Sequence, residues 1–204
     1  MWKKFMTGLL MAVALVTLTA CGGSSTGTAS QTTANTTNAA VPAKAAAGES
    51  KVLVVYFSAT GTTKNVAETI AANQKGTIFE IKPSEPYTSA DLNYRDKSSR
   101  VVKEHEQPKL RPAYDGDVAN WDTYDTVYVG YPLWWQQAPH VVYTFVEKHD
   151  FKGKRVIPFC TSVSSPLGSS GENLAKAAGS GDWQQGIRFS SGVSKEEILS
   201  WLQK

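Results

Sequence analysis

Strand-length runs of apolar residues alternate with helical patterns through most of this chain. Val52–Phe57, Thr126–Tyr131 and Arg155–Cys160 are three such runs, and each is largely apolar on both alternating faces. A strand that is apolar on both faces has to be covered from both sides. Strands that are separated by helices pair in parallel, with the helices lying on both faces of the sheet. The sequence therefore predicts an α/β fold built on a parallel sheet.

The remaining elements follow from the spacing of apolar residues. Thr63–Asn73 carries apolar residues at helical spacing shortly after the first strand. Near the C-terminus, Ser194 is a predicted N-cap, and Glu197 three residues later completes a capping box. The other predicted elements are strands at Thr77–Ile81 and Ile187–Phe189 and helices near Pro139–Lys148, Ser169–Ala178 and Lys195–Gln203.

One long segment, Pro83–Asn120, fits neither pattern. It is polar, contains four prolines and predicts at most one helix, near Ala90–Glu106. A segment of this length within a compact domain is more often a functional lid than filler. We therefore expect it to form a functional excursion from the sheet.

The first twenty residues have the layout of an export signal. Met1–Ala20 begins with Lys3 and Lys4, continues with a short apolar stretch and ends in small residues. Leu18–Cys21 resembles the bacterial lipobox, in which lipid is attached to the cysteine and cleavage occurs before it. The alternative is a signal peptide with an incidental cysteine. Lipidation of Cys21 would anchor the mature chain at the extracytoplasmic face of the cell membrane.

Residues 21–50 are predicted to form a disordered tether that starts at the lipidated cysteine. Gly22–Ser50 is dominated by Ala, Thr, Ser and Gly, so it has too little apolar surface to offset the entropy of ordering. As a flexible coil it would have an r.m.s. reach on the order of 30 Å. A stalk that carries O-linked sugars is another use of this composition. The folded domain would then span residues 51–204.

The charge balance of the predicted domain argues against nucleic-acid binding. The whole chain has a net charge of +3, but Lys3, Lys4 and Lys44 precede Lys51 with only Glu49 as an acid. From Lys51 onward, 18 basic residues stand against 17 acidic ones. No basic stripe interleaved with aromatic residues is present, so the sequence gives no support for a nucleic-acid partner.

The cysteines and histidines suggest neither a disulfide nor a metal site. Cys21 belongs to the processing signal, whereas Cys160 ends an apolar strand and is predicted to be a small buried hydrophobic residue. The histidines at 105, 140 and 149 are scattered through polar or helical contexts. We therefore predict no metal site.

Hydroxyl side chains and one glycine follow the first predicted strand, in the segment Ser58–Thr63. In an open parallel sheet, ligands bind beyond the carboxyl ends of the strands. The hydroxyls can donate to phosphate oxygens, Gly61 permits close backbone approach, and the next helix directs its unpaired N–H groups to the same point. We therefore expect an anion here, although a helix start that only caps itself has the same composition. The glycine spacing is not that of a Walker loop or a dinucleotide fingerprint.

Two further loops follow buried strands. Gly130–Pro139 places Trp134 and Trp135 in a loop, where packing does not demand them, and loop aromatics can form a stacking wall for a planar ring. Pro158–Ser170 is rich in small hydrogen-bond donors. We expect the phosphate cradle, the aromatic wall and the polar loop to share one edge of the sheet.

Four segments in order, "VVYFSATGTTKNVAETIA", "VGYPLWW", "YTFVEKHDFKGKRVIPFCT" and "LGSS", resemble the flavodoxin-like FMN proteins, in particular a branch found among bacterial lipoproteins. The resemblance covers Lys51 to Lys204. It implies a doubly wound, five-stranded parallel sheet of order 2-1-3-4-5 with helices on both faces. It also implies FMN as the cofactor at the switch point of the sheet, an arrangement for which flavodoxin is itself the standard example.

The resemblance assigns binding roles to three loops but no catalytic residue. Ser162–Pro166 departs from the glycine-rich run that is common in relatives, so this part of the site is expected to differ. The implied FMN-binding residues are Ser58, Ala59 (through its backbone), Thr60, Gly61, Thr62 and Thr63 at the phosphate, Pro132, Leu133, Trp134 and Trp135 at the isoalloxazine ring, and Thr161 and Ser162 in the third loop.

The resemblance implies an FMN electron-transfer protein, and the lipobox adds the expectation of a membrane anchor and of a partner protein or a quinone with which electrons are exchanged. Two alternatives remain, an FMN-dependent reductase of quinones or nitroaromatics under the excursion, and a surface lipoprotein that keeps the fold without the flavin. The ring-facing motifs contain no Lys or Arg to balance the negative charge of reduced flavin, which predicts a low reduction potential. The near-neutral domain also lacks the acidic surface that steers many flavodoxins to basic partners.

Overall fold

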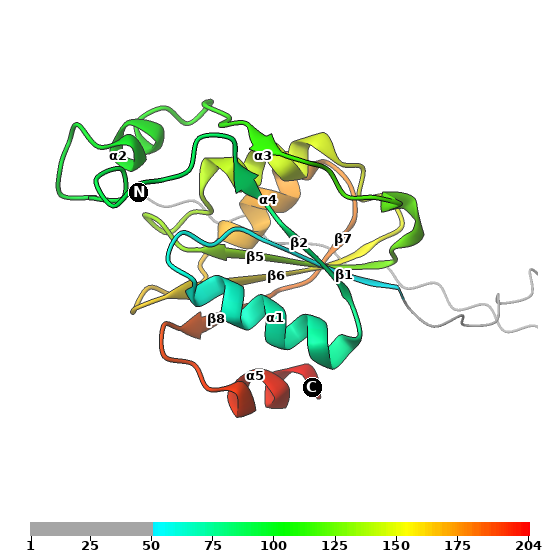
Figure 1. The fold of residues 1–204 in the computed structure, drawn as a ribbon. Helices are drawn as coiled ribbons and strands as arrows, with labels where there is room; N and C mark the ends of the chain where they lie inside the picture. Colours follow the sequence, from blue (N-terminus) through cyan, green and yellow to red (C-terminus); the bar gives the residue numbers. More distant parts are fainter. Residues whose placement is uncertain (1–50) are drawn as a thin grey trace, which may run out of the picture. The chain divides into compact units, whose positions relative to one another are not determined.

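Residues 51–204 are described by a computed structural model, in which one parallel sheet lies between two layers of helices (Figure 1). Helices α1 and α5 cover one face, and α3 and α4 cover the other. The predicted signal peptide, the lipidated Cys21 and the tether lie outside the described residues. The strands are β1 (Val52–Tyr56), β2 (Thr77–Glu80), β5 (Thr126–Pro132), β6 (Arg155–Ser162), β7 (Asp182–Trp183) and β8 (Ile187–Ser190), and the helices are α1 (Thr62–Gln74), α3 (His140–Lys148), α4 (Ser170–Ala178) and α5 (Lys195–Leu202).

The order of strands confirms the predicted topology. The sheet runs β2-β1-β5-β6-β7, β8 also pairs with β6, and every pair in it is parallel. With β5 and β6 as the third and fourth strands and the β7–β8 stretch as the fifth, this is the order 2-1-3-4-5. The capping box of α5 is also confirmed, since Ser194 and Glu197 bond to each other's backbone N–H groups.

The predicted count of five strands needs one correction, because two short strands share the fifth position. β7 pairs with Arg155 and Val156, and β8 pairs with Phe159–Ser162. Pro158 lies between these two pairings and has no N–H to donate. Its carbonyl faces this edge, since a Cβ added to Gly186 would lie only 2.3 Å from the Pro158 oxygen. The fifth strand therefore leaves the ladder where β6 cannot donate to it.

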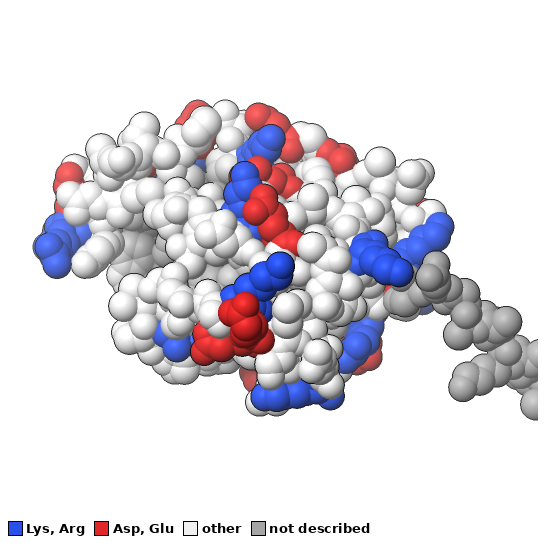
Figure 2. Space-filling model, turned by 60° about the horizontal axis from the view of Figure 1, so that its bottom comes forward, with Lys and Arg blue, Asp and Glu red and all other residues white. Residues whose placement is uncertain are grey.

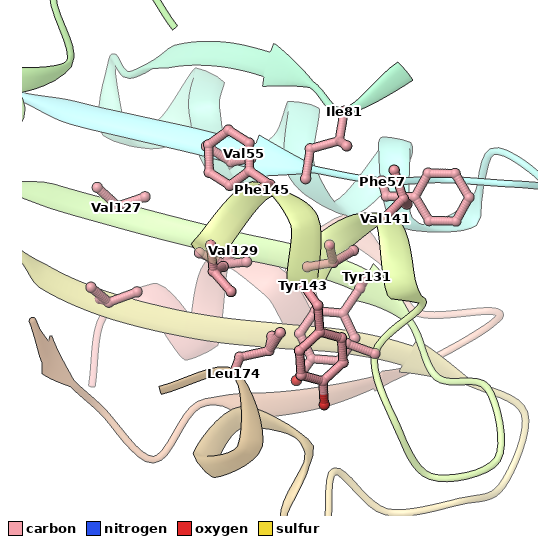
Figure 3. Packing of buried hydrophobic residues seen from close by; sticks show 14 of the residues in the cluster. Val55, Phe57, Ile81, Val127, Val129, Tyr131, Val141, Tyr143, Phe145 and Leu174 are labelled. Atoms are coloured by element: carbon pink, nitrogen blue, oxygen red, sulfur yellow. The ribbon is translucent and has the colours of Figure 1, made fainter. Parts of the chain in front are cut away.

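The core is divided into two layers by the sheet. On the α3 and α4 side, Val55, Val129 and Tyr131 pack against Phe145 and other apolar residues of those helices (Figure 3). The opposite layer is formed by the alternate residues of the same strands with α1 and α5. β1 is buried along its whole length, as its apolar sequence predicts.

Gly130 permits one close contact within the α1 and α5 layer. A Cβ at this position would lie 2.1 Å from Cζ of Phe159 on the neighbouring strand. Glycine inside an apolar strand is explained here by an aromatic ring that crosses over it.

The excursion starts from a small antiparallel pair, β3 (Lys82–Pro83) and β4 (Tyr114–Asp115). It contains a single short helix, α2 (Arg100–His105), and is followed by the 3-10 turn η1 (Trp121–Thr123). The helix predicted near Ala90–Glu106 is thus too long. The side chain of Asp96 accepts hydrogen bonds from the backbone N–H and hydroxyl of Ser98, a local turn that competes with helix until Arg100.

One face of the domain carries mixed charge. On the face drawn in Figure 2, basic and acidic side chains are interspersed and neither sign forms a continuous field. Within residues 51–204, none of the helices combines the length and the apolar character needed to cross a membrane.

Candidate cofactor-binding site

The first loop leads into a helix whose initial N–H groups are left uncapped. Ser58 Oγ accepts a hydrogen bond from the Gly61 N–H at 3.1 Å, and Gly61 is the N-cap of α1 with φ of 91°. No side chain caps α1, and its first turn contains no acidic residue. A Cβ at Gly61 would meet nothing within 4 Å, so the space beside the loop is open. The geometry favours an anion site over the self-capping alternative.

The three predicted loops meet at Thr161. Its Oγ1 lies 2.8 Å from Oγ1 of Thr63 in the first turn of α1, and both side chains are buried. Its carbonyl accepts a hydrogen bond from the Leu133 N–H of the second loop at 2.9 Å. The expectation that these loops share one edge of the sheet is therefore confirmed.

The second loop contains a tight turn between Trp134 and Gln137. Their backbones exchange two hydrogen bonds, of 3.0 and 2.9 Å. The two central residues, Trp135 and Gln136, have φ of 46° and 62°. Positive φ at both central positions defines a type I′ turn, and for residues other than glycine this region costs roughly 1–2 kcal/mol each. Surrounding contacts must hold the turn in this conformation.

The rings of the two tryptophans have different surroundings. Trp134 packs edge-on against Phe57 (5.7 Å between centroids) and Tyr87 (5.5 Å). Trp135 is stacked on His105 of α2, with centroids 4.5 Å apart and planes 8° apart, and is 41% exposed. The expectation that packing does not demand these residues is wrong for Trp134, which joins the end of β1 to the excursion.

The third loop is held by the side chain of Arg188, a residue that lies outside the three predicted loops. Arg188 of β8 donates from Nε to Ser162 Oγ at 3.0 Å. It also donates to the carbonyl oxygens of Ser162 and Val163, at 2.8 and 2.7 Å. Ser162 Oγ in turn donates to the Ser165 carbonyl. These bonds give the segment Ser162–Ser165, which contains no glycine, a defined shape.

Two buried residues, Tyr131 of β5 and Cys160 of β6, lie in the strands that lead into the second and third loops. Tyr131 Oη lies 2.9 Å from Ser170 Oγ, which donates to the Leu167 carbonyl at 2.7 Å, and burial raises the pKa of Tyr131. Cys160 is fully buried, and burial raises the pKa of its thiol to about 12. The thiol therefore stays protonated near neutral pH, which confirms Cys160 as a small hydrophobic residue.

The structure thus joins Thr63, Leu133 and Thr161 directly and leaves Ser58–Gly61 as an open loop beside them, with Thr62 as the first residue of α1. Sequence reasoning missed Arg188, and its only signal was a lone cation inside the apolar run of the last strand. Among residues 51–204, no group of three or more His, Cys, Asp or Glu side chains is placed to hold a metal ion.

Comparison with known proteins identifies relatives of this domain. Residues 51–204 match the family model described as Flavodoxin. A candidate flavoprotein from Bacteroides eggerthii is 44% identical with a TM-score of 0.70, and the match covers 76% of this chain and 96% of that chain. A candidate flavoprotein from Bacteroides uniformis is 42% identical with a TM-score of 0.72, and the match covers 76% and 99%. A search of curated proteins finds no match.

A more distant likeness concerns the fold. A flavoprotein from Lactobacillus acidophilus, solved in complex with FMN, is 21% identical with a TM-score of 0.57, and the match covers 75% of this chain and 99% of that chain.

The Thr63–Thr161 hydrogen bond should contribute measurably to stability. Thr63→Val leaves the buried Thr161 hydroxyl without its partner, so we expect the free energy of unfolding to fall by about 1–3 kcal/mol in urea titrations. In the double variant Thr63→Val/Thr161→Val, no hydroxyl is left unpaired, and the loss should be smaller than the sum of the two single losses. Additive losses would contradict the pairing.

Proposed function

The chain belongs to the flavodoxin family, and from this membership we propose that its carboxyl edge binds FMN and that the protein is an electron-transfer flavoprotein. The meeting of three loops at Thr161 is the observation that carries the proposal. It brings an anion-binding helix start, an aromatic turn and a polar loop to one edge. FMN offers a phosphate, a ribityl chain and a planar ring, which match these three parts.

The residues at the first loop fit a phosphate. The uncapped N–H groups of α1 and the hydroxyls of Thr60 and Thr62 are donors, and no carboxylate in the first turn repels an anion. Gly61 leaves the approach open. Bound FMN would supply the redox chemistry, whereas the protein positions the ring and sets the charge around it.

FMN binding through the phosphate is tested by a charge at the tip of the first loop. Thr60 is exposed, so Thr60→Asp should leave the fold intact while placing a carboxylate beside the phosphate. We expect the FMN dissociation constant to rise about 10-fold or more, because repulsion between like charges at short range amounts to about 1–4 kcal/mol. Riboflavin, which has no phosphate, should bind both proteins equally well.

The control for this variant is Thr60→Asn, which has nearly the same shape as the Asp variant and no charge. It should bind FMN within about 3-fold of the parent. A domain that stays colourless and takes up no FMN would instead support the flavin-free lipoprotein.

Arg188 adds a positive charge that the three motifs lack. Its guanidinium lies against the backbone of Ser162 and Val163, in the third of the loops assigned to FMN. A cation there stabilises the negative charge that reduction adds to FMN, so it works against the low potential expected from the motifs alone.

Arg188→Gln should therefore lower the midpoint potential of bound FMN. We expect a decrease on the order of 30 mV, which is ~1.4 kcal/mol for a two-electron couple. Arg188→Lys keeps the charge and should retain most of the potential. A redox titration in which the Gln and Lys variants shift equally would assign the effect to lost loop contacts instead of lost charge.

We further propose that the protein works outside the cytoplasm, anchored through Cys21. The lipobox Leu18–Cys21 and the polar residues 22–50 support this location. Electrons would then be exchanged with a partner protein or a quinone at the membrane. The near-neutral charge balance of residues 51–204 gives little steering toward a strongly basic partner, and a lipid anchor would raise the local concentration of partners instead.

The anchor is tested by Cys21→Ser. Cells grown with a radiolabelled fatty acid should label the parent chain but not the variant, and the variant should leave the membrane fraction. Labelling that persists in the variant would show that the lipid is attached at another residue, which would contradict an anchor at Cys21.

A further inference from the structure

A cavity of about 240 Å³ lies between the excursion and α3. It is bounded by α2 and Pro108 on one side and by residues 134–140 on the other, and it reaches α4 at Asn173. We refer to it as the α2–α3 pocket. Of the residues assigned to FMN, only Trp134 and Trp135 line it, so it adjoins the flavin site without coinciding with it.

The walls of the α2–α3 pocket are mainly aromatic and aliphatic. Trp134, Trp135 and Tyr143 contribute rings, and Val101 and Pro108 contribute aliphatic surface. The volume is below the range typical of drug-sized ligands, so the pocket suits one or two fused rings. The strained turn at Trp135 and its stack on His105 keep an indole at this wall.

The charged groups of the pocket are already paired within the protein. Glu104 is buried and accepts hydrogen bonds from Arg100 Nε at 2.7 Å and Tyr87 Oη at 2.6 Å. Arg111 makes two hydrogen bonds to Glu147, at 2.8 and 2.7 Å. A charged ligand would have to break one of these pairs or lose its own hydration without compensation. The pocket therefore favours a neutral ligand.

His140 is a polar group of the pocket whose buried ring nitrogen has no hydrogen-bond partner within residues 51–204. Neither of its ring nitrogens has a hydrogen bond among residues 51–204, and Nδ1 is buried. Burial lowers the pKa of His140, so the ring is neutral near pH 7. We assign the proton to Nε2, because a buried acceptor is left unpaired more often than a buried N–H donor. His140 thus offers an N–H donor in the pocket wall, suited to a carbonyl oxygen.

We propose that the α2–α3 pocket binds a small neutral quinone, its ring lying among Trp135 and Tyr143 and one carbonyl accepting a hydrogen bond from His140. A quinone is planar, uncharged and needs only a donor from the protein. The pocket lies beside the turn assigned to the flavin ring, so a bound quinone could accept electrons from FMN. This role as electron acceptor rests on the proposed function. Binding itself requires no FMN.

The proposal is tested by equilibrium dialysis of 2,3-dimethyl-1,4-naphthoquinone against the purified full chain without FMN. This probe has no free ring position for reaction with thiols. We expect saturable binding that weakens about 10-fold in His140→Leu, the loss of one buried hydrogen bond. His140→Gln keeps an N–H donor and should bind within about 3-fold of the parent.

A second pair of variants tests the location. Within residues 51–204 the Asn173 side chain makes no hydrogen bond, so Asn173→Trp should fill the pocket without disturbing the fold, and binding should be lost at an unchanged unfolding midpoint. Lys176→Trp on the same helix lies outside the pocket and should bind as the parent does. If Asn173→Trp binds the probe as tightly as Lys176→Trp does, the assignment to this pocket is overturned.

Two further arms separate this proposal from its rivals. 1,4-Naphthoquinone-2-sulfonate should bind at least about 10-fold more weakly than the neutral probe, and tighter binding would make the pocket an anion site. Saturating FMN should leave the probe in place, whereas competitive displacement would make the pocket part of the flavin site. Probe binding by a chain that takes up no FMN would support the pocket and remove the electron-transfer proposal. Absence of saturable probe binding would overturn the proposal that the pocket binds a quinone and would leave the proposed FMN function standing.

Discussion

The parallel register of three strands is the constraint on which the rest of the structure depends. Tyr56 of β1 lies beside Gly130 of β5, which lies beside Phe159 of β6, so the three strands end close together at one edge. Each loop that follows therefore starts within a few residues of this row of the sheet. The hydrogen bonds of Thr161 to the first and second loops are possible only because of this register. A slip of one residue in β6 would turn Thr161 to the other face and separate the loops.

Most of the sheet could be predicted because its signals are local. β1 is buried on both faces, and a sequence that is apolar on both faces records this directly. The bounds of α1 and the capping box of α5 depend on neighbouring residues and were predicted within one or two positions. The interruption between β7 and β8 was not predicted. Pro158 is visible in the sequence, but the side to which its missing N–H would point depends on which strand lies beside β6.

The site was predictable in composition and less so in packing. Hydroxyl residues after β1 and a threonine after β6 mark the loops, yet the Thr63–Thr161 bond joins residues 98 positions apart. Trp134 was expected to be free for a ligand, and instead it packs on Phe57 and Tyr87. That contact depends on the path of the excursion, which has little periodicity to reveal it. Arg188 escaped notice for a similar reason, since its role follows from the pairing of β8 with β6.

The divided fifth strand also affects how this sheet meets other molecules. An exposed strand at the edge of a sheet offers a row of N–H and C=O groups to which a foreign chain can add. Here the outer row consists of a two-residue and a four-residue piece, and residues 184–186 between them belong to neither piece. A neighbouring copy would find no continuous template for β-augmentation on this side. A proline that shortens the ladder within the domain thereby protects the domain against edge-to-edge aggregation.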